Sequence, residues 1–341
     1  MAFDPGVVRQ AGILLERQKE ERARRRDRLE QELYRQDPRL KQLDQALRGT
    51  MMQLAGLLAS GKTLKADGPE IAAVRERNLS LQGARARLIR ELGHDPQELE
   101  VTPACPQCGD TGWADGKMCR CLKQLCVQEQ MRRLTSLMNL TPEQSFDQLR
   151  LDVYSDQPWK GQERSPREQM RRVVRVCEGF AMQFPDYPLK NLLLSGGTGL
   201  GKTFLSGCIA REVSRRGYSV VYETAIDLFG AYETRRFTRD AEEERQARAD
   251  TRRYLRCDLL ILDDLGSEMT SPLSQSALYE VVNSRLQQER RTIISTNLSL
   301  EQISQRYTPQ IASRIGGLFR ELTFYGADIR RAWAQDGQTT Q

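Results

Sequence analysis

Residues 196–203 form a glycine-rich string of the kind that binds nucleotide phosphates. The string fits the pattern GxxxxGK[ST] and reads Gly196, Gly197, Thr198, Gly199, Leu200, Gly201, Lys202, Thr203. Glycines let successive backbone N–H groups curl around phosphate oxygens, and a helix beginning there adds a favourable dipole. In such a loop Lys202 reaches the β- and γ-phosphates and the Thr203 hydroxyl ligates Mg²⁺. The string therefore predicts a nucleotide site with bound Mg²⁺.

A second string, Gly56–Thr63, matches the same pattern. The residues before it have helical periodicity, and no apolar strand ending in carboxylates follows it before the cysteines. Gly61 is better interpreted as the C-cap of a helix. The string at 196–203 has the required context, with an expected strand at Asn191–Ser195 before it and an expected helix at Lys202–Arg216 after it. We expect nucleotide binding only there.

Polar side chains follow two further apolar runs. Asp263 and Asp264 end the run Leu259–Leu262. We expect Asp263 to hold Mg²⁺ through water and Asp264 to polarise the attacking water. Asn297 ends the next strand and can orient that water, although an Asn at a strand end is usually a turn or N-cap residue.

Two arginines complete the candidate hydrolytic site. Arg314 lies in a helix that Thr308 is expected to cap. After a complete phosphate-binding core it is interpreted as an arginine finger, with an ordinary surface role as the alternative. Such a finger acts across a subunit boundary and contributes on the order of 10³–10⁵ in rate. Arg330 is a candidate sensor of the γ-phosphate.

A cluster of cysteines predicts a metal site. Two pairs, Cys105 with Cys108 and Cys119 with Cys121, are separated by ten residues that include three glycines. Paired thiolates on glycine-rich turns suit a closed tetrahedral Zn²⁺ site with a structural role. The second pair is the tighter C-x-C, so replacement of one ligand by Cys126 or His94 stays open, and a redox dithiol is a minor alternative. The other three cysteines are expected in the core.

The surrounding pattern indicates the elements that position these residues. Leucines and methionines recur at helical spacing from Leu40 to Leu58, a second stripe runs from Ile71 to Leu92, and we expect the two to pair as a helical hairpin. From Asn191 onward, apolar runs alternate with helical spans, which is typical of a parallel sheet covered by helices on both faces. The expected strands contain Leu192–Leu194, Val220–Tyr222, Leu259–Leu262, Thr292–Ser295 and Leu322–Phe324.

Length and composition set outer bounds. The chain has 341 residues, 39% hydrophobic and 29% charged, with a formal net charge of +6. A wholly disordered chain would be less apolar and a membrane protein more so. The N-terminus lacks the pattern of a signal peptide, so we expect a soluble, cytoplasmic protein with no membrane partner. The charge permits nucleic acid as a partner. The arginine-rich helix expected at Val8–Leu33 either contacts DNA or a partner, or is a solvated face.

With these motifs assembled, the chain resembles the DnaC/DnaI-type bacterial replicative helicase loaders of the AAA+ superfamily, to which the transposition ATPase IstB is related. It resembles in particular the longer, zinc-containing form of Gram-positive bacteria and their phages. The segments that carry the resemblance are PRLKQLD (38–44), CPQCGDTGW with CRCLKQ (105–124), NLLLSGGTGLGKTFLS (191–206), DLLILDDLGSE (258–268), TIISTNLSLEQ (292–302), SRIGG (313–317) and FYGADIR (324–330).

The resemblance implies an AAA+ fold and residue roles. Lys202 and Thr203 correspond to Walker A, Asp263 and Asp264 to Walker B, Asn297 to sensor 1, Arg314 to the arginine finger and Arg330 to sensor 2. ATP, Mg²⁺ and Zn²⁺ are the implied cofactors. Most AAA+ proteins have Glu where this chain has Asp264, and the shorter side chain implies slow hydrolysis.

The resemblance also implies partners and domains. Residues 1–100 would form a helical hairpin that grips the replicative DNA helicase hexamer (DnaB/DnaC-type). Residues 101–140 would form a zinc-binding module and linker helix, and residues 141–335 an AAA+ ATPase domain that binds ATP and single-stranded DNA and self-associates when ATP-bound. Residues 336–341 are expected to be a disordered tail. The implied function is a slow, switch-like ATPase that loads the helicase.

Three points stay open at this stage. An IstB-like transposase-helper ATPase has the same fold with a different client. An adaptor that binds nucleotide without significant turnover is a further alternative. The helix expected at Ala225–Phe237 either faces DNA, with Phe229 and Tyr232 stacking on bases beside Arg235 and Arg236, or packs as an ordinary amphipathic helix.

Overall fold

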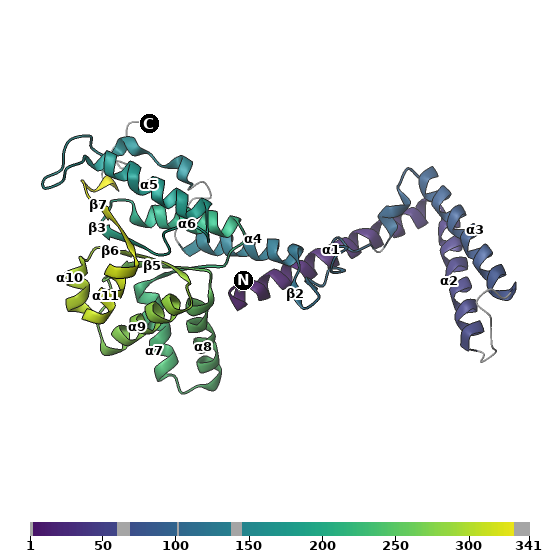
Figure 1. Ribbon diagram of the computed structural model, residues 1–341. Coiled ribbons are helices and arrows are strands. Elements are labelled where there is room, and N and C mark those ends of the chain that lie inside the picture. Colours follow the sequence, from purple (N-terminus) through teal and green to yellow (C-terminus); the bar gives the residue numbers. More distant parts are fainter. Residues whose placement is uncertain (1–2, 60–68, 101, 138–144, 331–341) are drawn as a thin grey trace. The chain divides into compact units, whose positions relative to one another are not determined.

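The computed structural model describes residues 3–59, 69–100, 102–137 and 145–330, and Figure 1 shows its elements. The chain forms two compact units, one of residues 13–119 and one of residues 120–341 together with residues 1–12. The glycine and lysine of the second phosphate-loop string, Gly61 and Lys62, and the expected tail 336–341 lie outside the described residues. None of the described helices is long and apolar enough to cross a membrane.

The unit of residues 13–119 is mainly helical. Its helices are most of α1 (Pro5–Gln36), then α2 (Pro38–Ala59), α3 (Pro69–Glu91) and the short 3₁₀ turn η1 (Pro96–Leu99). α2 and α3 pack against each other as the expected hairpin, around a core that contains Leu40 and Ile89. The stripe is not buried along its whole length, because Met51 is 70% exposed and Leu54 is 37% exposed. The hairpin therefore presents apolar side chains far from its own core.

The other unit is built on a five-stranded parallel sheet, which confirms the expected fold class. The strand order is β4-β5-β6-β3-β7, and every neighbouring pair is parallel. The strands are β3 (Leu192–Gly196), β4 (Val220–Thr224), β5 (Leu259–Leu265), β6 (Arg291–Thr296) and β7 (Arg320–Phe324). Each of the five expected apolar runs lies in one of them.

Helices cover both faces of this sheet, so the side chains of the central strands alternate between two buried cores, whereas the edge strand β7 is buried on one face only. Leu192 and Leu194 face one core, and Leu193 faces the other. The first core is covered by α4 (Arg120–Leu137), α5 (Pro166–Met182) and α6 (Lys202–Arg215). The second is covered by α7 (Ala225–Phe237), α8 (Ala241–Arg256), α9 (Pro272–Gln287), α10 (Leu300–Arg306) and α11 (Pro309–Leu318). Burial on both faces explains why the strands read as continuous apolar runs.

The strand order decides where the polar side chains meet. β6 lies between β5 and β3, so three adjacent parallel strands end at one edge of the sheet. The phosphate-loop string follows β3, the two aspartates end β5 and Asn297 follows β6. In an open parallel sheet, ligands bind beyond the carboxyl ends of the strands. The fold therefore brings together three motifs that are separate in the sequence, at residues 196–203, 263–264 and 297.

Candidate nucleotide site and cysteine cluster

A cavity of about 710 Å³ opens at this edge of the sheet. Most of the nucleotide-site residues expected from the sequence line it: Thr198, Gly199, Leu200, Gly201, Lys202, Thr203, Asp263, Asp264, Asn297 and Arg330. Gly196 and Gly197 lie at the start of the same loop and accept hydrogen bonds from Lys202. The volume suits a small-molecule ligand.

The loop conformation depends on glycine at two positions. Gly196 has φ 143°, and a Cβ there would lie 2.1 Å from the carbonyl oxygen of Phe324. Gly201 has φ 93° and caps α6 in the left-handed region. The first backbone N–H groups of a helix have no partner within the helix, and its N-terminus favours negative charge. The start of α6 therefore offers N–H donors and a positive dipole to a phosphate in the cavity.

The Lys202 ammonium lies at the centre of the site. It donates to the carbonyls of Gly196 (2.6 Å) and Gly197 (2.7 Å) and to Oδ1 of Asn297 (2.6 Å). Burial lowers the pKa of Lys202, and the charges of Asp264 and Asp263 counter that effect. Lys202 is thus held between the phosphate loop and the tip of β6 by three acceptors, each of which favours the charged form.

Asp263 is the buried carboxylate of the site. Its Oδ2 accepts hydrogen bonds from the hydroxyls of Thr203 (3.1 Å) and Tyr222 (2.5 Å). Its Oδ1 accepts from the hydroxyl of Ser295. A carboxylate oxygen and a Thr hydroxyl side by side form a donor set that suits Mg²⁺, which is bound by a few protein oxygens together with phosphates. The geometry thus fits the expected metal roles of Thr203 and Asp263.

Asp264 is turned toward the cavity by an irregularity of β5. The pairing of β5 with β6 shifts register between Leu262 and Leu265, and Asp264 has φ 56°. Its N–H donates to Oγ of Ser295 at 2.9 Å. In a regular strand consecutive side chains point to opposite faces, whereas a bulge re-aims one of them. Both aspartates therefore line one cavity, and Asn297 Nδ2 lies 3.4 Å from Oδ1 of Asp264.

The two arginines are placed differently. Arg330 lines the cavity and is exposed, and its backbone N–H donates to Asp328. Arg314, on α11, is not among the cavity residues. Its guanidinium donates to Oδ1 of Asn283 and to the hydroxyl of Tyr279, each at 3.1 Å, and stacks over the Tyr279 ring. Arg314 therefore does not contribute to the cavity of its own chain, as the described residues form it.

Sequence reasoning missed one wall of the cavity. Leu149, Arg150, Val153 and Tyr154 line it, from a segment with two short 3₁₀ turns, η2 (Phe146–Gln148) and η3 (Leu151–Val153). The Tyr154 hydroxyl donates to the carbonyl of Leu200 at 3.1 Å, which ties this segment to the phosphate loop. Apolar side chains beside the loop suit the flat face of a nucleobase. The only sign of this wall in the sequence is that the segment around Tyr154 is irregular and aromatic, and such a pattern does not indicate a particular ligand.

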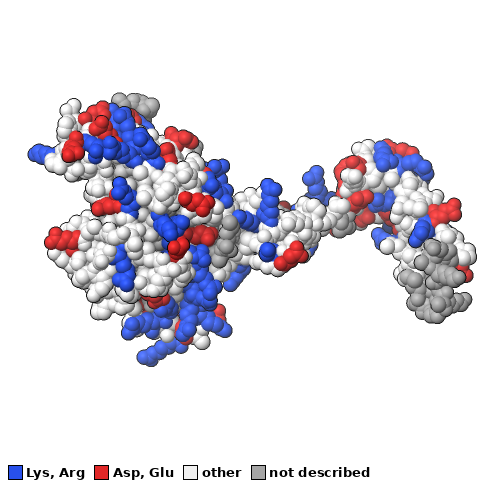
Figure 2. Space-filling view, in the orientation of Figure 1, with Lys and Arg blue, Asp and Glu red and all other residues white. Residues whose placement is uncertain are grey.

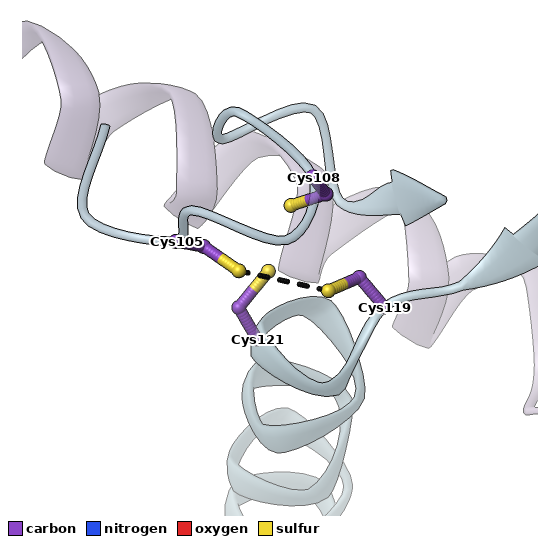
Figure 3. A group of neighbouring side chains, drawn as sticks. All are labelled: Cys105, Cys108, Cys119 and Cys121. Atoms are coloured by element: carbon purple, nitrogen blue, oxygen red, sulfur yellow. Dashed lines mark hydrogen bonds between the residues drawn. The ribbon is translucent and has the colours of Figure 1, made fainter. Parts of the chain in front are cut away.

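The four expected cysteines converge (Figure 3). Their sulfur atoms all lie within 4.8 Å of one another, and those of Cys105 and Cys119 are 3.6 Å apart. Thiolates at about 2.3 Å from a tetrahedral Zn²⁺ stand about 3.8 Å from each other. The spacing and the all-sulfur donor set therefore fit a metal ion. The strands β1 (Trp113–Ala114) and β2 (Lys117–Met118) form a small hairpin between the two pairs.

The two alternative ligands lie elsewhere. Cys126 is fully buried in α4, and burial raises the pKa of its thiol to about 11. His94 lies with Nδ1 3.5 Å from Glu98 Oε2. Neither belongs to the four-sulfur group, and no other such group is found in the part of the chain that the structure describes.

The DNA-facing interpretation of α7 fails for Phe229 and Tyr232. Phe229 and Tyr232 are 4% and 2% exposed and belong to the core beneath the sheet. Arg235 lies over the Tyr232 ring and pairs with Glu280 at 3.4 Å. Because these rings are buried against the domain, they cannot stack on bases. The sequence left this open, since helical spacing indicates a buried face without showing what covers it.

Comparisons with known proteins agree with this site. The family model of IstB-like ATP binding protein matches residues 177–314. The replicative helicase loader DnaC of Escherichia coli K12 is 26% identical over 130 residues, 38% of this chain and 51% of the loader. The insertion sequence IS5376 putative ATP-binding protein of Geobacillus stearothermophilus is 31% identical over 123 residues, 36% of this chain and 45% of that protein.

The similarity to solved structures is weak. A crystal structure of DnaI covers 57% of this chain and 93% of its own, with 20% identity and a TM-score of 0.43. The chain spans about half the length of the curated relatives it matches. The match to the family model covers the part of the chain that holds the phosphate loop and the aspartate pair.

Replacing Lys202 tests the nucleotide site. Lys202→Ala removes a charge-assisted hydrogen bond to phosphate, so ATP affinity should fall about 10- to 100-fold. Titration with a fluorescent ATP analogue measures it. Lys62→Ala, in the second matching string, is the matched control and should bind like the unaltered chain. Equal losses in the two variants would contradict the assignment.

Metal analysis tests the cysteine cluster. The purified chain should carry about one equivalent of Zn²⁺, and Cys119→Ala should abolish it because a three-thiolate site is open. Cys126→Ala should retain the metal. Zinc retained by Cys119→Ala but lost from Cys126→Ala would show that Cys126 is a ligand and that the four-sulfur assignment is wrong.

Proposed function

We propose that this chain is an ATP-dependent loader of the replicative DNA helicase onto single-stranded DNA. The observation that carries the proposal is the convergence of Lys202, Thr203, Asp263 and Asn297 around one cavity in a domain similar to the loader DnaC. The proposal extends to the bound groups: ATP with Mg²⁺ in the cavity, and Zn²⁺ held by the four cysteines.

Slow, switch-like hydrolysis follows from the catalytic carboxylate. Asp264 is one methylene shorter than Glu, and the nearest polar contact across the site, from Asn297, is long at 3.4 Å. A water between them would be polarised by Asp264 and oriented by Asn297. Lys202, the start of α6 and Arg330 would bind the phosphates.

Self-association would complete the site. Arg314 is held by Asn283 and Tyr279 outside its own chain's cavity, yet it lies at the surface on α11. An arginine held rigidly at a surface can insert into the nucleotide site of a neighbouring copy. ATP would thus join neighbouring subunits, and hydrolysis would depend on assembly.

Two surfaces suit the proposed partners. The exposed apolar residues of the hairpin include Met51, Met52 and Leu79, a set that suits burial against the helicase hexamer. Figure 2 shows Lys and Arg gathered over α7 and α8, where the exposed arginines include Arg236, Arg239, Arg252 and Arg256. Such a basic surface suits the phosphates of single-stranded DNA. The domain limits expected from the sequence, and a cytoplasmic location, form part of the proposal.

An IstB-like transposase helper is the second candidate function. The matching family description and the 31% identity to an insertion-sequence ATP-binding protein favour it. The cysteine cluster and the hairpin lie outside the matched residues 177–314. The match therefore does not cover the parts of the chain that would distinguish a helicase partner from a transposase partner. An adaptor without turnover is separated from both by its lack of ATPase activity.

Helicase capture tests the loader proposal. The full chain should co-elute with a replicative helicase hexamer and, with ATP, increase the helicase bound to single-stranded DNA. Met52→Asp puts a charge on the apolar hairpin surface and should weaken capture at least about tenfold, since burying that charge costs several kcal/mol. Met269→Asp, at another exposed methionine, is the matched control. Absence of capture by the unaltered chain, with capture of a transposase instead, would favour the second candidate.

The proposed finger is tested by separating binding from turnover. Arg314→Ala should bind ATP normally but lose most ATPase activity of the assembled state, by about 10³-fold if it acts as a finger. Arg320→Ala, an exposed arginine on β7, should keep its activity. Mixing Arg314→Ala with Lys202→Ala subunits should restore part of the activity, because each supplies what the other lacks. Normal turnover by Arg314→Ala would remove this role.

A further inference from the structure

Tyr222 is a buried side chain beside the candidate site that no sequence motif singled out. It is 6% exposed, lies on β4 and is not among the residues that line the cavity. Its hydroxyl donates to Oδ2 of Asp263 at 2.5 Å. A tyrosine that touches the metal-site carboxylate but not the cavity acts only through that carboxylate.

The strand register explains how Tyr222 reaches Asp263. Tyr222 pairs with Ile261, so Asp263 lies two residues further along the neighbouring strand. Residues two apart on a strand share a face, and such diagonal neighbours are within reach of a long aromatic side chain. The face is the one covered by α6, whose second residue is Thr203. Tyr222 and Thr203 therefore approach the same carboxylate oxygen from two elements.

The phenol is fixed in the role of donor. An ionised carboxylate can only accept hydrogen bonds, whereas a phenol hydroxyl can donate one, so Tyr222 is the donor in its contact with Asp263. Asp263 thus has Tyr222 and Thr203 on one oxygen and Ser295 on the other.

The three hydroxyls that donate to Asp263 differ in what else they contact. The Thr203 hydroxyl is itself an expected metal ligand, so its position would be set by Mg²⁺ as well as by its hydrogen bond to Asp263. Ser295 also accepts the backbone N–H of Asp264 and so serves two residues. Tyr222 has Asp263 as its acceptor and does not line the cavity.

From this geometry we infer that Tyr222 is a positioning residue that aims the Asp263 carboxylate at the Mg²⁺ of the bound nucleotide. The inference deepens the proposed function and rests only on its ATP–Mg²⁺ site, not on helicase loading. Hydrogen-bonding partners of metal-binding carboxylates fix the orientation of the ligand oxygens, and their loss weakens metal binding.

The test compares Tyr222→Phe with the unaltered full-length chain. The change removes one hydroxyl and keeps the ring. The Mg²⁺ concentration for half-maximal ATPase activity, and for half-maximal binding of a fluorescent ATP analogue, should rise about tenfold. Binding of the analogue in EDTA should stay unchanged, which a general structural defect would not allow. Tyr232→Phe, at a similarly buried tyrosine away from the cavity, is the matched control and should leave Mg²⁺ dependence unchanged.

The remaining outcomes each decide the matter. An unchanged Mg²⁺ dependence in Tyr222→Phe, or an equal shift in Tyr232→Phe, would overturn the inference. Should Tyr222→Phe lower the melting temperature, the Asp263→Asn background decides: there Tyr222→Phe should cause no further loss of Mg²⁺ affinity, and a further loss would overturn it. Failure of the unaltered chain to load helicase, with a normal tenfold shift in Tyr222→Phe, would reject the loader proposal and keep this inference.

Discussion

The insertion of β6 between β3 and β5 is the constraint on which the site depends. It places Asn297 between the phosphate loop and the two aspartates, so that its amide accepts from Lys202 on one side and lies near Asp264 on the other. All three strands are parallel and buried on both faces, so their carboxyl ends meet at one edge of the sheet. The sheet thus acts as a rigid scaffold that holds these side chains at fixed positions relative to one another, which the loops alone would not do.

Asp263 shows how tightly this scaffold controls the chemistry. A buried carboxylate is costly unless its oxygens accept hydrogen bonds. The hydroxyls of Thr203, Tyr222 and Ser295 supply them from α6, β4 and β6. These hydrogen bonds both stabilise the buried carboxylate and fix its orientation. Asp264 differs, because it lies at the bulge in β5 and is exposed.

The two phosphate-loop strings show that a match to the pattern indicates a nucleotide site only where the fold places the other site residues beside it. Both strings fit one pattern. Gly196–Thr203 connects β3 to α6 and meets the carboxylates of β5 in one cavity, whereas the second string begins within α2. The same logic governs the arginines. Arg330 reaches the cavity of its own chain, while Arg314 is fixed by Tyr279 outside it. Under the proposed function, this division would make turnover depend on assembly.

The sequence by itself determined the five strands, the phosphate loop, the aspartate pair and the cysteine quartet, because each is encoded in local periodicity or spacing. Tertiary structure alone decided that Tyr222 meets Asp263 and that Phe229 and Tyr232 of α7 belong to the core. It also decided that the segment around Tyr154 forms a wall of the cavity. Those contacts join residues far apart in the chain, and hydrophobic pattern records that a face is buried but not which partner buries it.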